Sequence, residues 1–135
     1  MQLTRNFKLS EFDCKSGCDM PESVLMEVKK LANQLQIIRD FIQQPIYINS
    51  GYRCAEHNAK IGGAHKIVNG KRVETSKHVL GQAADMRVDN VSPSDLYEAI
   101  ENLIKFNHIF EGGLGVYQTF THYDIKLTRS RWDNR

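Results

Sequence analysis

Hydrophobic and polar residues alternate most regularly between residues 21 and 44. Apolar side chains recur there at steps of three and four, which places them on one face of an α-helix: Val24, Leu25, Val28, Leu31, Leu35, Ile38 and Phe41. Pro21 suits the first turn, where its missing N–H costs no hydrogen bond. The helix is expected to end at Gln43-Gln44-Pro45, because the residue before a proline is pushed out of helical geometry.

A second amphipathic helix is predicted to begin at Ser92-Pro93. Ser92 is a good N-cap, and Pro93 is a good first helical residue. The apolar face that follows consists of Leu96, Ile100, Leu103 and Ile104. A shorter helix is expected over residues 55–61, where Gly62-Gly63 closes it.

The other apolar residues form short segments typical of β-strands, at 46–48, 83–88, 113–117 and 120–125. Within 66–73, Asn69-Gly70 stands between two β-prone runs and indicates a hairpin. We expect this hairpin either to act as a flap beside a substrate groove or to lie on the surface without touching substrate. Helices and strands mix without a regular βαβ alternation, so the sequence predicts an α+β fold in a single domain spanning 1–135.

Composition fits a soluble globular chain and argues against several functions. Basic and acidic residues are interspersed and the net charge is only +2, so we do not expect a nucleic-acid partner. No apolar run is long enough to span a bilayer, and no apolar stretch follows Met1 as it would in a secretory signal. The basic segment 126–135 is expected to be a solvated terminus, with weak attraction to anionic cell-wall polymers as the alternative. A monomer is expected.

The strongest chemical signal lies in the run Ser76-Lys77-His78-Val79-Leu80-Gly81-Gln82-Ala83-Ala84-Asp85. It places an imidazole and a carboxylate seven positions apart, and a second imidazole follows at His122. Two histidines and one carboxylate are the ligand set of a catalytic zinc site that keeps its fourth position open. The small residues between them allow backbone and ligand to approach closely. The simpler alternative is a polar loop entering a buried strand, with His78 exposed and Asp85 acting as a cap.

Three blocks of the chain resemble the M15 metallopeptidases, the group of zinc D-Ala-D-Ala carboxypeptidases. Ser76-x-His78-x-x-Gly81-x-Ala83-x-Asp85 is similar to the SxHxxGxAxD signature of that family. Residues 48–64 resemble the block before the signature, and 112–124 with Arg131-Trp132 resemble the closing block. The similarity covers nearly the whole chain in the right order. It implies the hedgehog/DD-peptidase fold, a small antiparallel sheet flanked by helices.

The resemblance also implies roles for individual residues. Zinc would be held by His78, Asp85 and His122, and would acidify a bound water to a pKa near ~7. Arg53 would contact a substrate carboxylate or carbonyl, and Ser76 and Tyr117 are expected to contact substrate.

The identity of the general base is a separate question. Many relatives carry an acid three residues before the last histidine ligand, where this chain has Thr119. One branch of the family instead shows the F-x-H-x-D arrangement found here, which points to Asp124. Because residues two apart in a strand face the same side, Asp124 should project beside His122. We expect Asp124 to be the catalytic base, with orientation of a metal ligand or a strand-end salt bridge as the alternatives.

The three cysteines are an odd number, which argues against a complete disulfide framework. We expect three reduced thiols, one or two of them buried. Two alternatives stay open. One is a second, structural zinc site at Cys14 and Cys18, completed by Cys54 or by His57. The other is a Cys14–Cys18 bridge in an oxidising setting.

These observations predict a zinc-dependent peptidase that acts on peptidoglycan stem peptides or cross-bridges, as an endolysin-like endopeptidase or a D,D-carboxypeptidase. The alternative is a non-catalytic cell-wall-binding or virion component on the same fold. An enzyme for the cell wall without an export signal fits a phage product that a holin or a virion releases from the host cytoplasm. It equally fits a periplasmic or secreted protein whose signal has been trimmed.

Overall fold

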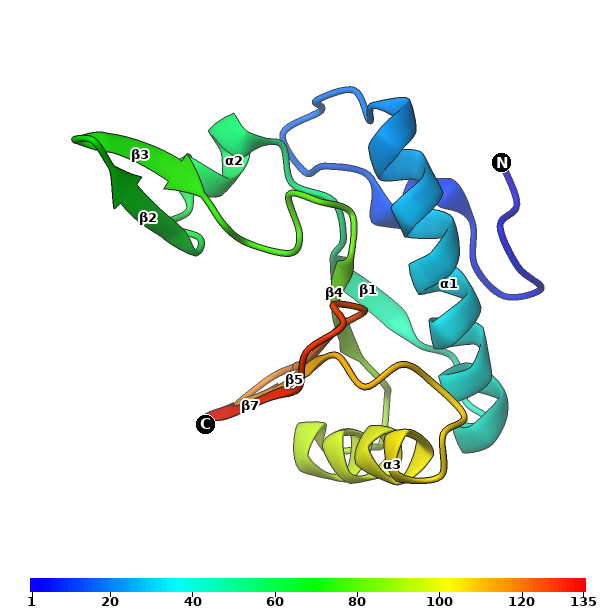
Figure 1. Ribbon diagram of the computed structural model, residues 1–135. Coiled ribbons are helices and arrows are strands. Elements are labelled where there is room, and N and C mark those ends of the chain that lie inside the picture. Colours follow the sequence, from blue (N-terminus) through cyan, green and yellow to red (C-terminus); the bar gives the residue numbers. More distant parts are fainter.

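A five-stranded mixed sheet forms the centre of the computed structural model, which describes residues 1–135 (Figure 1). In spatial order its strands are β1 (Tyr47–Ser50), β4 (Ala83–Arg87), β6 (Thr121–Asp124), β5 (Gly113–Tyr117) and β7 (Ser130–Asn134). The first four strands pair in antiparallel fashion, and β7 runs parallel to β5. The prediction of an α+β fold is confirmed. The expected antiparallel pairing is confirmed for β1, β4, β6 and β5, and only the β7 edge departs from it.

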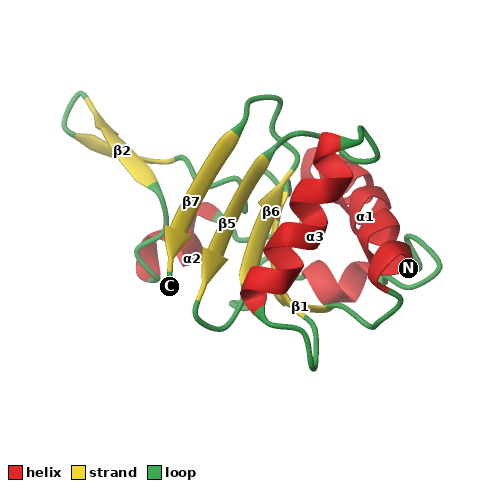
Figure 2. Cartoon of the chain, turned by 90° about the horizontal axis from the view of Figure 1, so that it is seen from below, coloured by secondary structure: helices red, strands yellow, loops and turns green.

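Two long helices, α1 (Glu22–Ile42) and α3 (Pro93–Lys105), pack beside the strands, as Figure 2 shows from below. Both begin where the sequence predicts. The Ser92 hydroxyl caps α3 by accepting the Asp95 N–H at 3.1 Å. Helix α1 ends in the left-handed conformation of Gln43, whose N–H donates to the Arg39 carbonyl. Neither helix, nor any other in the chain, is long and apolar enough to cross a membrane.

The sheet presents different chemistry on its two faces. Ala84, Met86, Leu114 and Tyr123 are fully buried and join the apolar side chains of α1 and α3 in one cluster. Their neighbours along the same strands point to the opposite face, and the buried polar ones among them are Asp85, His122 and Asp124. One face of the sheet therefore forms the core, and the other is free to carry a functional site.

Two small helices and a hairpin complete the fold. The 3₁₀ helix η1 (Leu9–Phe12) precedes α1, and α2 (Ala55–Lys60) follows β1. The predicted hairpin is present as β2 (His65–Val68) and β3 (Lys71–Glu74), and it projects away from the sheet (Figure 1). Asn69 and Gly70 both have positive φ angles, 51° and 74°, as a tight two-residue hairpin turn requires.

Strand β7 was not expected, because residues 126–135 were predicted to form a solvated terminus. That prediction is wrong. Trp132 lies opposite Gly115 in the parallel pair, and its ring fills the space that a side chain at Gly115 would need. Arg131 donates to both carboxylate oxygens of Glu101, at 2.8 and 2.9 Å. The positive charge that suggested a solvated tail is therefore paired with an acidic residue of α3.

Candidate metal centre

The three residues proposed as zinc ligands converge on the open face of the sheet. In the register of β4 and β6, Asp85 lies directly opposite His122. The Asp85 carboxylate is 3.3 Å from His78 Nε2 through Oδ2 and 2.9 Å from His122 Nδ1 through Oδ1. All three side chains are buried, with residue exposures of 3% for His78, 7% for Asp85 and 8% for His122. The simpler alternative, an exposed His78, is thereby contradicted.

The turn before β4 fixes the position of His78. The Ser76 hydroxyl accepts the His78 N–H at 3.2 Å, and the His78 carbonyl accepts the Arg53 N–H at 3.1 Å. His78 Nδ1 donates to the Gly51 carbonyl at 2.7 Å, which directs Nε2 toward Asp85. Gly81 ends the turn with a φ of 75°, in close contact with α1. Ser76 thus serves here as a backbone cap inside the cleft.

His122 is held from both of its ring nitrogens. Nδ1 faces Asp85, and Nε2 lies 2.8 Å from Oδ2 of Asp124. The second Asp124 oxygen accepts the N–H of Gly113 at 2.9 Å and that of Lys126 at 3.3 Å. A side chain at position 113 would overlap the Asp124 carboxylate, so only glycine at this position leaves room for that carboxylate. Asp124 shares a strand face with His122, as predicted, and its carboxylate is engaged by that histidine.

Burial and hydrogen bonding move the pKa values of the four groups in different directions. Burial lowers the pKa of His78 below its usual value. For His122 burial acts in the same direction, but the hydrogen bonds to Asp124 and Asp85 outweigh it and raise the pKa. Burial alone would raise the pKa of both carboxyl groups. At Asp124 the hydrogen bond from His122 outweighs burial, and at Asp85 the hydrogen bonds from His122 and His78 do so together. The pKa values of both carboxyl groups therefore lie below the usual range.

Arg53 lies at the edge of the cluster and is held by three contacts. Its guanidinium donates to Ser50 Oγ at 3.2 Å, to Asn58 Oδ1 at 3.3 Å and to Asp85 Oδ2 at 3.4 Å. Asn58 is fully buried, and its amide nitrogen donates to Glu74 at the base of the hairpin at 2.9 Å. Burial lowers the pKa of Arg53 although Asp85 opposes the shift. A fixed guanidinium of this kind suits the recognition of a carboxylate or a carbonyl oxygen.

The cluster lies in a cleft of ≈ 490 Å³. One wall is aromatic: Tyr117 stacks on Phe120 at 4.3 Å, and Trp132 donates to the Tyr117 hydroxyl at 2.9 Å. The cationic side chains in the lining are those of Arg53, Lys77 and Lys126, and the acidic ones are those of Asp85 and Asp124. Trp132 was assigned no role from the sequence, although the Arg131-Trp132 pair was part of the closing block.

Three other carboxylates that could serve as a base lie outside the cleft lining, namely Glu74, Asp89 and Glu111. Glu74 is paired with Arg72, and Glu111 with Arg129 and Arg131. The hairpin approaches the cleft only at its base, where Gly63, Ala64 and Thr75 contribute to the lining. His65 and His108 are exposed.

The cysteines form a separate cluster, in which the expectation of three reduced thiols and the alternative of a Cys14–Cys18 bridge are both wrong. Cys18 is joined by a disulfide to Cys54, not to Cys14. Cys14 is a free, buried thiol. Cys18 and Cys54 lie 36 positions apart, so nothing in the local sequence pattern indicated this pairing.

The donor set at His78, Asp85 and His122 fits zinc. One nitrogen or oxygen atom from each residue lies within 4.8 Å of the other two. Donors bound to one zinc ion at about 2.0–2.1 Å in a tetrahedron are about 3.3 Å apart. The distances from the Asp85 carboxylate to His78 Nε2 and His122 Nδ1, 3.3 and 2.9 Å, are close to this value. The remaining ring nitrogens are bonded to the Gly51 carbonyl and to Asp124, as is usual for metal-binding histidines.

Comparison with known proteins supports the same assignment. A search of curated proteins finds no match. The sequence model of the family described as Peptidase M15 matches residues 2–124, a range that contains the complete His78, Asp85 and His122 cluster and ends just before β7. Because this match covers far more than half of the sequence, the chain belongs to the peptidase M15 family.

Proposed function

We propose that this M15 peptidase is a zinc enzyme that hydrolyses peptide bonds in the stem peptides or cross-bridges of peptidoglycan. The observation that carries the proposal is the convergence of three buried donor groups in a cleft, each imidazole fixed from its other nitrogen. Peptidoglycan as the substrate is supported by the resemblance of three sequence blocks to the D-Ala-D-Ala carboxypeptidase group. The site of action would then be the cell wall.

His78, Asp85 and His122 would hold the zinc ion, which supplies an acidified water and polarises a carbonyl oxygen. The Gly51 carbonyl keeps the proton of His78 on Nδ1, and Asp124 keeps the proton of His122 on Nε2. With zinc bound, His78 Nε2 and His122 Nδ1 would lose their protons, and each imidazole would present an unprotonated nitrogen to the metal beside Asp85. The aromatic wall of Tyr117, Phe120 and Trp132 restricts water on one side of that space.

The charge of the cleft fits an anionic peptide. Arg53, Lys77 and Lys126 border the metal centre, and the two acidic side chains in the lining are both engaged by histidines. A peptide with a free C-terminal carboxylate, or with carboxylate side groups near the scissile bond, would meet the ammonium groups of Lys77 and Lys126, which form no salt bridge, and the Arg53 guanidinium, whose acidic partner is Asp85 at 3.4 Å. Stem peptides carry such carboxylates.

The contacts of Asp124 favour the orienting role over that of general base. One of its oxygens accepts two backbone N–H groups, and the other faces His122 Nε2. We propose that Asp124 fixes the ring and the tautomer of His122 and so acts on the reaction through that ligand.

The test is hydrolysis of purified peptidoglycan by the zinc-loaded protein, with the products identified by mass spectrometry. Release of single D-alanine residues identifies a carboxypeptidase, and release of cross-linked fragments with new amino termini identifies an endopeptidase. His78→Ala should abolish either product. His108→Ala, which changes an exposed histidine outside the cleft, is the matched control and should retain activity.

Two results would contradict the proposal. One is a folded, zinc-loaded protein that releases nothing from peptidoglycan. The other is a His78→Ala variant that cleaves as well as the His108→Ala control. A protein that binds peptidoglycan without cleaving it would instead support the non-catalytic alternative.

A further inference from the structure

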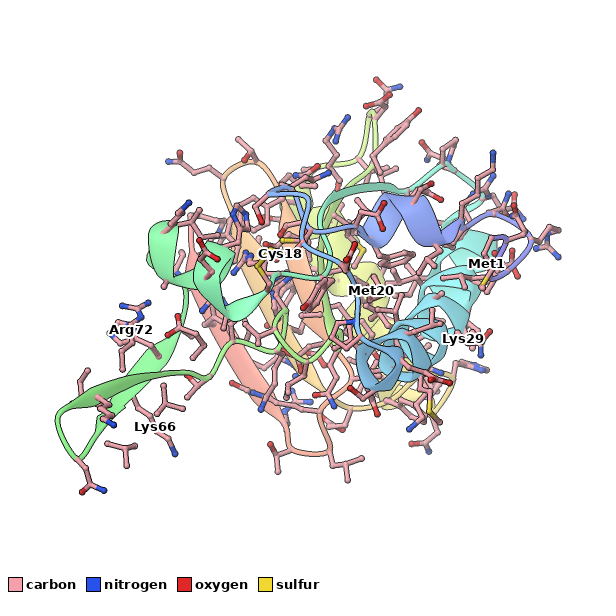
Figure 3. The ribbon with its side chains drawn as sticks, turned by 90° about the horizontal axis from the view of Figure 1, so that it is seen from above. Met1, Cys18, Met20, Lys29, Lys66 and Arg72 are labelled. Carbon is pink, nitrogen blue, oxygen red and sulfur yellow. A yellow bond between two sulfur atoms is a disulfide. The ribbon has the colours of Figure 1, made fainter.

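A second group of metal-binding side chains lies outside the cleft. Cys14 and Cys18 belong to the loop between η1 and α1, and Cys54 is the N-cap residue of α2. The three sulfur atoms lie within 4.8 Å of one another. Figure 3 shows Cys18 near the top of the sheet, away from the hairpin that carries Lys66 and Arg72. The peptidase function described above uses none of these cysteines.

The spacing of the sulfurs matches thiolate coordination. Sulfur atoms bound to one zinc ion at about 2.3 Å in a tetrahedron are about 3.8 Å apart. Cys14 Sγ lies 3.9 Å from Cys54 Sγ, although these two residues are not bonded to each other. Two segments that are separate in the chain, the loop with Cys14 and Cys18 and the start of α2 with Cys54, thus already bring their sulfur atoms to metal-binding distance.

Polar groups around the sulfurs favour the thiolate form. The Ser16 hydroxyl lies 3.1 Å from the sulfurs of Cys14 and Cys18 and 3.7 Å from that of Cys54. The Cys54 N–H points to Cys14 Sγ at 3.5 Å. Burial raises the pKa of Cys14, but the hydrogen bonds from Ser16 and from backbone N–H groups outweigh it and lower the pKa.

We propose that Cys14, Cys18 and Cys54, in their thiol form, hold a structural zinc ion, with the Ser16 hydroxyl at the fourth corner of the tetrahedron. This site is independent of the metal centre at His78. Its occupancy depends on redox state, because the disulfide form leaves only Cys14 as a thiol.

The conversion between the two forms balances with a dithiol as reductant. The dithiol gives two electrons and two protons to the Cys18–Cys54 bond and becomes a disulfide itself. Zinc then replaces the protons of the three thiols, which are released to solvent. Metal binding and the disulfide are therefore alternative links between the same two segments.

The disulfide and the proposed zinc ion would each hold residues 51–54, which contact the metal centre of the cleft. Cys54 adjoins Arg53, and the Tyr52 N–H donates to the Phe12 carbonyl of η1 at 2.8 Å. The Gly51 carbonyl accepts from His78 Nδ1. Residues 51–54 thus connect the cysteine cluster to the arginine and to one histidine of the metal centre.

The test is zinc content after anaerobic reduction, measured by elemental analysis in a His78→Ala background that removes the metal centre of the cleft. The reduced His78→Ala protein should retain about one zinc ion per chain, on the usual stoichiometry of a structural site. His78→Ala/Cys14→Ser should retain none. The oxidised His78→Ala protein should also retain none, which serves as an internal control without a further mutation.

Cobalt substitution of the reduced, otherwise unaltered protein gives a second readout that does not depend on the folding of variants. Cobalt bound by thiolates should show an intense thiolate-to-metal charge-transfer band in the near ultraviolet, which the oxidised protein lacks. A reduced His78→Ala protein without zinc, together with no such band, would overturn the proposal. Neither measurement involves peptide hydrolysis, so the cysteine site is tested separately from the peptidase function.

Discussion

Asp85 and Asp124 are two buried carboxylates with low pKa values, and they differ in what their oxygens touch. Asp85 contacts both histidines and Arg53, with one oxygen facing each ring. Asp124 contacts one histidine and two backbone N–H groups. The first arrangement suits a metal ligand and the second suits a residue that positions one. Substitution at the two positions should therefore give different results.

Asp124→Asn should weaken zinc binding about 10–100-fold, the usual effect of removing a carboxylate that hydrogen-bonds to a metal-binding histidine. The asparagine keeps its shape but loses the charge that holds the proton on His122 Nε2. Competition with a chromophoric chelator measures the affinity. Asp89→Asn, at an exposed position outside the cleft, is the control and should bind zinc normally. Unchanged affinity with a rate loss of ~100-fold or more would instead identify Asp124 as the base.

Arg53→Lys should lower kcat/KM about 10–100-fold, as expected for loss of charged hydrogen bonds worth about 1.5–3 kcal/mol. A lysine keeps the charge but cannot replace a planar group that reaches Ser50, Asn58 and Asp85 together. Zinc content should not change, since Arg53 is not a ligand. Arg87→Lys, on the exposed end of β4, is the matched control. Turnover equal to that of the control would show that Arg53 does not recognise substrate.

Elements with a strong local pattern could be predicted from the sequence, and β7 could not. The periodic apolar residues of α1, the Ser92 cap of α3 and the Asn69-Gly70 turn each depend on neighbours within a few positions. Strand β7 depends on Gly115 and Glu101, which are distant in sequence. For the same reason the ligand set and the place of Asp124 beside His122 could be proposed from a motif and a strand period. The two backbone N–H groups that hold Asp124 and the Cys18–Cys54 bond required the fold.

Trp132→Ala should destabilise the protein by about 1–3 kcal/mol, because it empties the space above Gly115. The ring also lies 4.9 Å from that of His122 and donates to Tyr117, so activity should fall as well. Urea unfolding followed by circular dichroism gives the free-energy change. Leu127→Ala is the control, since that side chain is 92% exposed. Equal unfolding midpoints for the two variants would mean that β7 adds nothing to stability.

At the scale of the whole molecule, the disulfide connects the N-terminal loop to the start of α2. Breaking it in the presence of a chelator should lower the free energy of unfolding by up to about 4 kcal/mol, from the chain entropy of the loop that it closes. Thermal unfolding with and without a dithiol measures the effect. Adding zinc to the reduced protein should recover part of the loss. An unfolding temperature that does not respond to the dithiol would contradict a stabilising role for the bond.

The alternation of core and site residues along β4 and β6 restricts how this sequence can change. Asp85 and Met86 are neighbours, yet one faces the cleft and the other the core. Inserting one residue into β4 would move the carboxylate into the apolar cluster and expose the methionine. Inserting two residues would restore both faces and shift Asp85 only along the strand. Steps of two in these strands should therefore keep the core but move Asp85 about 7 Å along the strand, out of its position opposite His122. The hairpin strands contribute no residue to the cleft lining, so their length can vary without this cost.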